Sequence, residues 1–464
     1  MGSAATSSVA SPGRPPGRLR EELRRIAQDL RNPRSRERRE LCRRRWETLP
    51  DELRTPQQAA GRAHVACGAT HGVLERCNFA CSACYLTPIA NRTPKLPFIR
   101  VREQLDALRR SLGPMGKVQI TSGEVTLLEP DELGRIVAYA RQIGLDPMVM
   151  TNGQRFTDEP DYLPTLVRDR GLRKVAIHVD VTQRGRRGFR TGDSEASLRP
   201  VRDHFAALIR KTRRETGHRV DAAHTVTVTP DNIKEIPEIL GWALENHDAF
   251  RMVSFQPVAE IGRTRDRRDS EVSLDSVWSK VCETVGRSLN RNALHFGHPA
   301  CNIVCPLFVV SFGERLEIVE CVPEGDRRGL ALLSRLLEAV GGLDPLGSDL
   351  GRGITRFISI LARNPGLLAS AGIYGLTRAW RQRRLLGSIV ASLALLRPVR
   401  IRPWILVVHG FMNREELSTP LGRERLGACV FRVPVGGRMV SMCELNATEL
   451  RLELNREQGA ARPR

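Results

Sequence analysis

Between residues 72 and 257, apolar and polar positions alternate with two different periods. Short apolar runs, typical of buried strands, are separated by longer segments whose apolar residues recur every three or four positions, as on one face of a helix. The strand-like runs cover residues 73–76, 118–121, 148–151, 175–179, 224–229 and 252–256. The helix-like segments cover residues 101–112, 131–143, 163–170, 198–216 and 233–246. This order predicts an α/β fold with a parallel sheet, and six strands suit a barrel or partial barrel.

The pattern changes on both sides of this region. Residues 1–18 are rich in Ser, Ala, Pro and Gly, so we expect a disordered tail. Residues 19–70 are rich in arginine and predict a basic helical segment lying on the domain. Its apolar residues at helical spacing are Leu19, Leu23, Ile26 and Leu30. We therefore expect the core barrel at residues 71–265 and an extension rich in α-helix at residues 266–464.

The amino-acid composition limits the classes of protein to which the chain can belong. With 464 residues, 41% of them hydrophobic, the chain can bury a large core. Its 73 Lys and Arg against 52 Asp and Glu give a charge of +21, which predicts attraction to nucleic acid or to membrane head groups. The eleven cysteines come without a secretory signal or a run of about 20 apolar residues. This favours a cytoplasmic protein whose cysteines bind metal.

The most informative stretch is residues 71–86. Cys77, Cys81 and Cys84 form a C-x3-C-x2-C motif directly after the first strand-like run. Three thiolates on one loop can bind three corners of a cubane iron–sulfur cluster and leave the fourth iron open. A structural zinc site needs four ligands, usually as two pairs, and no partner pair lies nearby. Chemistry is expected at this loop because active groups of such barrels lie at the carboxyl ends of the strands.

The motif and its surroundings resemble the radical S-adenosylmethionine (SAM) superfamily. Members share a C-x3-C-x2-C loop, followed by an aromatic residue such as Tyr85, after the first strand of a partial (βα)6 barrel. The segment 121–124 is similar to the family's Gly-Gly-Glu motif, with Ser122 in place of the first glycine. The resemblance spans residues 71–265. It implies a [4Fe–4S] cluster on Cys77, Cys81 and Cys84.

The resemblance also implies a set of SAM-binding residues. Glu124 is the candidate for the SAM amino group, and the turn that contains Thr151 and Asn152 matches one at which the family positions SAM. The alternative for Tyr85 is ordinary core packing, and for Asp180 it is a structural role at a strand end. The expected cofactor-binding residues are Tyr85, Ser122, Gly123, Glu124, Thr151, Asn152, His178, Asp180 and Gln256. The implied chemistry is reductive cleavage of SAM to a 5′-deoxyadenosyl radical, with electrons from a donor such as flavodoxin or ferredoxin.

Five more cysteines follow the predicted barrel. They are Cys301, Cys305, Cys321, Cys429 and Cys443. These residues could bind an auxiliary, second iron–sulfur cluster. The alternative is that each is a small buried hydrophobic residue. We expect Cys282, which lies within a helical pattern, to belong to the core.

Residues 350–414 have the most unusual composition, with eleven arginines and neither Asp nor Glu. Arginines beside apolar helical faces favour peripheral association with an anionic membrane, here the inner face of the cell membrane. Nucleic acid is the less favoured ligand, since only 5% of residues are aromatic and no base-stacking platform is visible. Residues 254–258, 262–263, 298–301 and 429–446 also resemble radical SAM enzymes of the tetraether-lipid synthase type. That resemblance implies a lipid substrate.

The sequence leaves three hypotheses open. The first is a radical SAM enzyme that abstracts hydrogen from a lipid or another hydrophobic substrate. The second is a radical SAM enzyme that modifies peptide or RNA and uses an auxiliary cluster. The third is a binding protein without catalytic activity, in which the cluster is a structural or redox element. Production of 5′-deoxyadenosine separates the first two from the third.

Overall fold

The computed structural model describes residues 33–190, 192–264, 272–312, 315–340, 364–395 and 398–460. The predicted tail at residues 1–18 lies outside the described residues, as do the four periodic residues between Leu19 and Leu30. The first helix with described bounds is α2 (Pro33–Glu47). It lies on the rest of the chain, since its Glu37 pairs with Arg109 at 2.7 Å and its Arg45 donates to the carbonyl of Ala428 at 2.9 Å.

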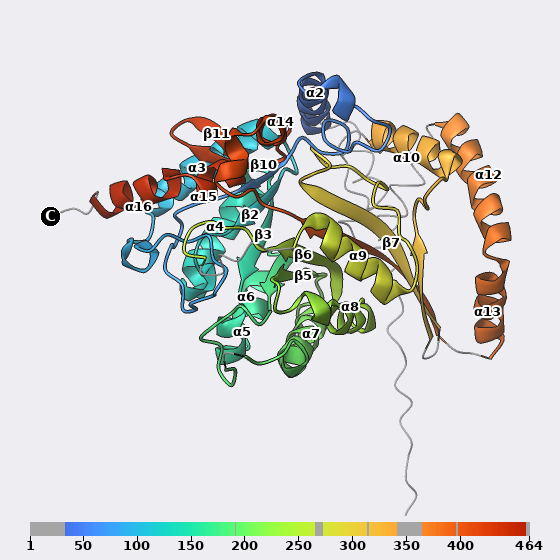
Figure 1. Cartoon of the computed structure of the whole chain (residues 1–464), viewed down its shortest axis with the longest axis horizontal. Helices are drawn as coiled ribbons and strands as arrows, with labels where there is room; N and C mark the ends of the chain where they lie inside the picture. Colours follow the sequence, from blue (N-terminus) through green and yellow to red (C-terminus); the bar gives the residue numbers. More distant parts are fainter. Residues whose placement is uncertain are drawn as a thin grey trace, which may run out of the picture.

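The centre of the molecule is one curled sheet in the strand order β11-β10-β1-β2-β3-β4-β5-β6-β9-β7-β8 (Figure 1). Strands β1 to β6 pair in chain order, and every pair is parallel. Their bounds are β1 (Cys67–Ala69), β2 (Lys117–Ile120), β3 (Asp146–Thr151), β4 (Lys174–His178), β5 (Asp221–Val228) and β6 (Phe250–Pro257). The prediction of an α/β fold with a partial (βα)6 barrel is confirmed.

Helices connect these strands and cover the sheet. The connecting helices are α3 (Phe98–Leu112), α4 (Pro130–Gln142), α5 (Gln154–Asp158), α6 (Tyr162–Asp169), α7 (Arg199–Thr216) and α8 (Ile236–Glu245). Helix α3 shows why they pack as they do. Its buried Val101, Leu105, Leu108 and Leu112 recur every three or four positions and so share one apolar face. That face joins the main hydrophobic core.

The predicted strand at residues 73–76 is wrong, because β1 ends at Ala69. Gly72, with a φ of +67°, turns the chain out of the strand direction. Val73 and Leu74 are buried in the loop that follows, where the carbonyls of Leu74 and Arg76 accept hydrogen bonds from Gly123 and Glu124 at 2.9 Å. The apolar run therefore reflects a buried loop, and it carries the chain toward the cysteine motif.

Residues beyond 265 extend both edges of the same sheet. Strand β9 (Val399–His409) pairs in parallel with β6, and β7 (Asn302–Phe312) and β8 (Arg315–Glu320) continue from it in antiparallel. At the other edge, β10 (Phe431–Val435) pairs in parallel with β1, and β11 (Arg438–Ser441) pairs with β10. The extension thus contributes strands as well as helices. The domain boundary at residue 265 stays a prediction.

The helices of the extension are α9 (Leu274–Val285), α10 (Arg327–Val340), α12 (Pro365–Arg381), α13 (Arg383–Ala394), α14 (Pro420–Gly427), α15 (Met442–Ala447) and α16 (Leu450–Ala460). Figure 1 shows α12 and α13 along one side of the molecule, beyond β7. Among the helices that the structure describes, none has the length and apolar character needed to cross a membrane.

Candidate active site

The three cysteines of the motif lie on the loop after β1 and share one arginine. The Nε of Arg263 donates to the Sγ of Cys84 at 3.3 Å, and its terminal nitrogen donates to the carbonyl of Phe79 at 3.2 Å. The guanidinium of Arg263 also interacts electrostatically with the sulfurs of all three cysteines. Burial raises the pKa of the Cys77 thiol to about 12 and that of Cys81 well above its usual value.

This donor set fits a cluster with one open iron. Buried thiols with such high pKa values keep their protons unless a cation replaces them, as a bound metal does. Within the described ranges, no group of three or more His, Cys, Asp or Glu is arranged to hold a single metal ion. In a cubane cluster each thiolate binds its own iron, so the cysteine sulfurs lie further apart than they do around a single metal ion. The loop supplies three cysteine ligands, the number that a cubane cluster with one open iron takes.

Two glycines let neighbouring loops pack directly against the cysteine loop. A Cβ on Gly123 would lie 2.2 Å from the carbonyl oxygen of Glu75, and one on Gly262 would lie 2.3 Å from that of Tyr85. Gly262 also has a φ of +59°, which favours glycine. The cysteine loop is thus held between the loops that follow β2 and β6.

We expect Gly123→Ala to destabilise the protein by about 1–3 kcal/mol, the usual cost of overpacking. The added methyl group would meet backbone atoms on either side, the carbonyls of Glu75 and Arg76, and these cannot rotate away. Urea unfolding measures the loss. Gly241→Ala is the matched control, because Gly241 lies within α8 and a Cβ there meets nothing within 4 Å. Equal stability of the two variants would contradict the close packing of the loop.

Glu124 connects three of the predicted motifs. Its carboxylate is 2% exposed and accepts hydrogen bonds from the Thr151 hydroxyl at 2.8 Å and the Asn152 amide at 2.7 Å. Asn152 in turn donates to the Asn78 side chain at 2.8 Å, next to Cys77. Burial raises the pKa of Glu124. The structure therefore brings the cysteine loop, residues 121–124 and the turn at 151–153 together. The contact of Glu124 with the SAM amine stays a prediction.

Asp180 anchors the carboxyl end of β4. It is 1% exposed and accepts hydrogen bonds from the Thr182 hydroxyl and the Thr227 amide, both at 2.6 Å, while the Nε2 of His178 lies 2.5 Å from it. Burial raises the pKa of Asp180, but His178, Thr182 and Thr227 outweigh burial and lower the value to about 2. This geometry fits the structural alternative for Asp180. His178 and Gln256 are less buried, at the ends of β4 and β6.

Comparison with known proteins gives one curated relative for part of the chain. No family model matches. The relative is 7,8-dihydro-6-hydroxymethylpterin dimethyltransferase from Methanocaldococcus jannaschii, 26% identical over 204 residues. The match covers 42% of this chain and only 37% of the relative. Over that part the chain is similar to this methyltransferase. In the structure, the cysteine motif follows β1 of the parallel half-barrel, and the motifs at residues 121–124 and 151–153 pack beside it.

Comparison with solved structures gives matches of low similarity. SuiB of Streptococcus suis bound to SAM has a TM-score of 0.35 and 16% identity, over 48% of each chain. Methylornithine synthase (PylB) has a TM-score of 0.33 and 13% identity, over 69% of this chain and 80% of that one. Both TM-scores are too low to support an argument about function.

Two of the expected SAM-binding residues belong to a buried network beside the cysteine loop. The Tyr85 hydroxyl donates to the carbonyl of Ser122, and the Arg451 guanidinium lies 4.8 Å from the centre of the Tyr85 ring. The Ser122 hydroxyl donates to Glu75 at 2.7 Å. This environment fits the packing alternative for Tyr85.

The centre of that network is the ion pair of Glu75 and Arg451, which no motif in the sequence predicts. The two side chains are 2.9 Å apart, and the residues are 1% and 3% exposed. Helix α16 makes two further contacts on the same loop, from Asn455 to Thr87 at 2.7 Å and from Gln458 to the carbonyl of Gly72 at 2.9 Å. Residues at such spacings share one helix face. Helix α16 thus clamps the loop that contains the cluster cysteines.

The five C-terminal cysteines fall in two places. Cys301 and Cys443 lie beside the loop that follows β9, where the Gly410 amide donates to the carbonyl of Cys301 and the Met412 amide to the Sγ of Cys443, and Cys429 precedes β10. Cys305 is fully buried in β7 and lies nearer to Cys282 and Cys321. Cys282 is half-buried and packs against the main core, as expected.

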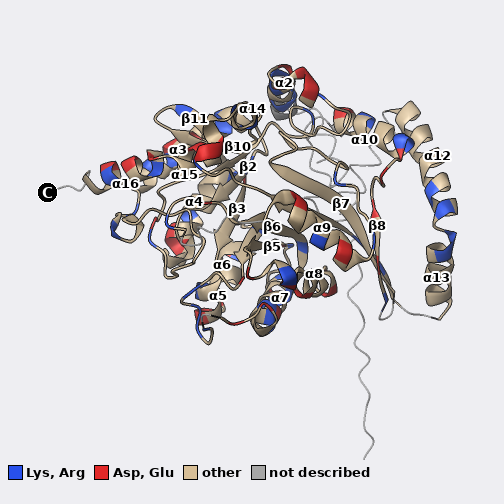
Figure 2. Ribbon diagram, viewed as in Figure 1, with Lys and Arg blue, Asp and Glu red and all other residues tan. Residues whose placement is uncertain are grey.

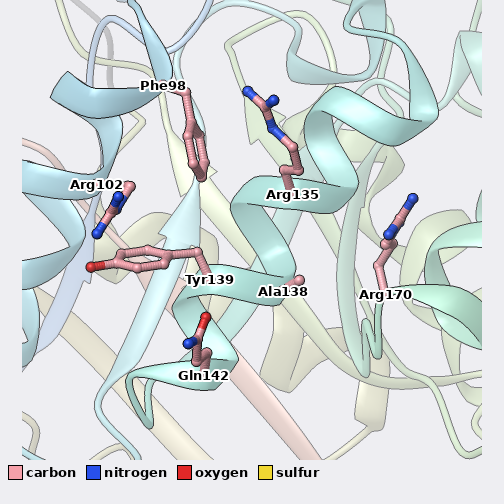
Figure 3. Close-up of a pocket in the computed structure, with 7 residues that line it drawn as sticks. All are labelled: Phe98, Arg102, Arg135, Ala138, Tyr139, Gln142 and Arg170. Carbon is pink, nitrogen blue, oxygen red and sulfur yellow. The ribbon is translucent and has the colours of Figure 1, made fainter.

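A shallow pocket lies on the helical layer (Figure 3). It is lined by Phe98, Arg102, Arg135, Ala138, Tyr139, Gln142 and Arg170. Two of its arginines stack on aromatic rings, Arg102 on Tyr139 at 4.6 Å and Arg135 on Phe98 at 4.5 Å. None of the expected cluster or SAM residues lines this pocket, so it is separate from the candidate active site.

Proposed function

We propose that the chain is a radical SAM enzyme whose catalytic [4Fe–4S] cluster is bound by Cys77, Cys81 and Cys84. The observation that carries the proposal is the triplet of thiols beside Arg263, at the carboxyl end of a parallel half-barrel. When bound, such a cluster supplies the electron that cleaves SAM to a 5′-deoxyadenosyl radical, which abstracts hydrogen from the substrate.

The chain's own residues prepare this site. Arg263 places a positive charge beside the cysteine loop through its hydrogen bond to the Sγ of Cys84. Glu124 fixes the turn at 151–153 through the Thr151 hydroxyl and the Asn152 amide. We propose that His178 and Gln256, half-buried near the carboxyl ends of β4 and β6, contact SAM. Their part is to orient the cofactor before the radical forms.

The test uses the full chain, reconstituted anaerobically with iron and sulfide. We expect 5′-deoxyadenosine after addition of SAM and a strong reductant, measured by mass spectrometry. A chain that holds a full cluster and forms no 5′-deoxyadenosine would favour a binding protein without catalytic activity. Because the curated relative is a methyltransferase by name, S-adenosylhomocysteine is measured in the same samples as the sign of methyl transfer.

For the substrate we propose a lipid or another hydrophobic molecule met at an anionic membrane surface. The proposal is supported by α12 and α13, which carry basic but no acidic residues (Figure 2). Their exposed large hydrophobic residues, with the adjoining Leu395, are Leu368, Ile373, Leu376, Trp380, Leu386, Val390, Leu393 and Leu395. The arginines of the two helices are Arg378, Arg381, Arg383 and Arg384. Exposed apolar side chains beside arginines are typical of helices that lie in a lipid interface.

We expect the double variant Leu376→Ser/Trp380→Ser to bind anionic vesicles at least about tenfold more weakly, since each large apolar side chain contributes roughly 1.5–3 kcal/mol when buried. Leu376 and Trp380 are 75% and 73% exposed and lie one turn apart on α12. Cosedimentation of the full chain with phosphatidylglycerol vesicles measures the effect. Leu421→Ser on α14, 48% exposed before substitution, is the control. Salt-sensitive binding to RNA with no binding to vesicles would instead favour RNA modification.

A further inference from the structure

The loop that follows β6 holds Cys84 through the backbone. The amide of Arg263 donates to the carbonyl of Cys84 at 2.9 Å. In return, the amide of Cys84 donates to the hydroxyl oxygen of Thr264 at 3.1 Å. The neighbouring Gly262 lets the two backbones approach, since a Cβ there would lie 2.3 Å from the carbonyl oxygen of Tyr85. The last cysteine of the motif is therefore fixed to the same short segment that carries the Arg263 side chain.

This loop is also attached to the neighbouring strand. The amide of Glu260 donates to the side-chain oxygen of Asn413 at 2.7 Å, which connects the loop after β6 to the loop after β9. Because β6 and β9 pair in parallel, both loops lie at the same end of the sheet. That is the end at which such barrels place their active groups. Arg263 thus extends from a backbone that is held both by Cys84 and by the loop after β9.

The Arg263 side chain connects two of the three cysteines. Its Nε donates to the Sγ of Cys84 at 3.3 Å, and its terminal nitrogen donates to the carbonyl of Phe79 at 3.2 Å. The amide of Phe79 in turn donates to the Sγ of Cys77 at 3.4 Å. One guanidinium therefore contacts the sulfur of Cys84 directly and reaches that of Cys77 through the backbone of Phe79.

A cation in this place affects electron uptake by a cluster on these cysteines. Reduction of a [4Fe–4S] cluster by one electron adds one negative charge, and its reduction potential depends on nearby charge and on hydrogen bonds to the sulfurs. A positive charge and N–H donors stabilise the reduced form more than the oxidised form, so both raise the potential. Arg263 is half-buried, and its charge is therefore screened less by water and salt than that of an exposed arginine.

We propose that Arg263 raises the reduction potential of the cluster on Cys77, Cys81 and Cys84 by donating to Cys84 and by holding Phe79 against Cys77. The proposal rests on the proposed function of that site. The electron comes from a low-potential donor, which is dithionite in the experiment below, and no bond of Arg263 forms or breaks. Arg263 is thus a positioning residue whose charge and donors act through the cysteine sulfurs.

The test is an anaerobic redox titration of the full reconstituted chain without SAM, followed by electron paramagnetic resonance. The signal that is absent from Cys81→Ala identifies the cluster concerned. We expect Arg263→Leu to lower the midpoint potential by about 59 mV, which is a tenfold change in the equilibrium constant for one electron. Arg263→Lys keeps the charge but cannot donate to both partners, so we expect an intermediate value. Iron and sulfide analysis of each sample shows how much cluster is present.

Arg184→Leu is the matched control. The Arg184 side chain is exposed, while its carbonyl accepts a hydrogen bond from the amide of Ala80 in the cysteine loop at 2.8 Å. The substitution therefore removes one positive charge near the loop and keeps the backbone contact. We expect the midpoint potential of this variant to equal that of the unaltered chain.

Arg263→Gln is included because Arg263→Leu could lose its cluster. Glutamine keeps an N–H donor and removes the charge, so a lower midpoint potential is expected here too. Equal midpoint potentials in the unaltered chain and in the Arg263 variants that hold a cluster would overturn the role of Arg263 and leave the proposed function standing. An equal fall in Arg184→Leu would do the same, since the effect would not depend on the contact with Cys84.

Two results concern assembly of the cluster. Loss of the cluster from all three Arg263 variants would overturn the proposal, because Arg263 would then be needed to assemble the cluster. Absence of iron and sulfide from the unaltered chain would overturn both this proposal and the proposed function. Circular dichroism of each variant shows whether it is folded.

Discussion

Cys81→Ala is expected to remove about four irons from the reconstituted chain and to abolish formation of 5′-deoxyadenosine. Cys81 is on the loop after β1, between Cys77 and Cys84 in the motif. Two remaining thiols cannot hold three corners of a cubane cluster, so we expect the loss to be complete. Iron analysis and mass spectrometry of the same sample measure both effects.

Cys282→Ala is the control for that variant. Cys282 lies in α9 and packs against the main core, so the variant loses a small apolar contact but no expected cluster ligand. We expect its iron content to equal that of the unaltered chain. Full iron content in Cys81→Ala would refute the assignment of the first cluster.

Arg451→Ala is expected to lower the free energy of unfolding by about 3–5 kcal/mol, the usual cost of removing one partner of a buried ion pair. The substitution leaves the Glu75 carboxylate buried without its cation and removes the guanidinium that lies over the Tyr85 ring. Urea unfolding measures the loss. The loop that contains the cluster cysteines should also become more accessible, which hydrogen exchange measures.

Two further variants distinguish the contribution of the ion pair to stability from that of other residues of α16. Arg456→Ala changes an exposed arginine of α16, and we expect an effect within about 0.5 kcal/mol. The double variant Glu75→Gln/Arg451→Met should recover part of the loss, because the buried charge is removed together with its partner. A cost for Arg451→Ala no greater than that for Arg456→Ala would refute the clamp.

Local patterns were enough to predict most of the barrel. Strands β2 to β6 and the helices α3, α4, α6, α7 and α8 lie within a few residues of their predicted positions, because buried strands and amphipathic helices have distinct periods. The short helix α5 was not predicted. Residues 73–76 misled the prediction, because Val73 and Leu74 are apolar for burial in a loop. Strands β7 to β11 were not predicted. Their place depends on pairing with β6 and β1, far away in the sequence.

The candidate active site was also predicted only in part. The cysteine triplet and residues 121–124 are short motifs, so the sequence alone could locate them. Glu75 could have been noticed as a charge within an apolar run, but nothing near it points to Arg451, 376 residues away. Nor does the sequence reveal that the Glu124 carboxylate would already accept hydrogen bonds from Thr151 and Asn152. Such facts depend on the folded chain.

The clamp by α16 has a consequence for how the protein is made. A ribosome that adds about 5–20 residues per second releases Glu75 on the order of tens of seconds before Arg451. During that interval the cysteine loop lacks three of its polar contacts, those from Arg451, Asn455 and Gln458. The nascent loop is then more open than the finished one. Iron and sulfide delivered before residues 450–460 are complete would meet a loop that can still move.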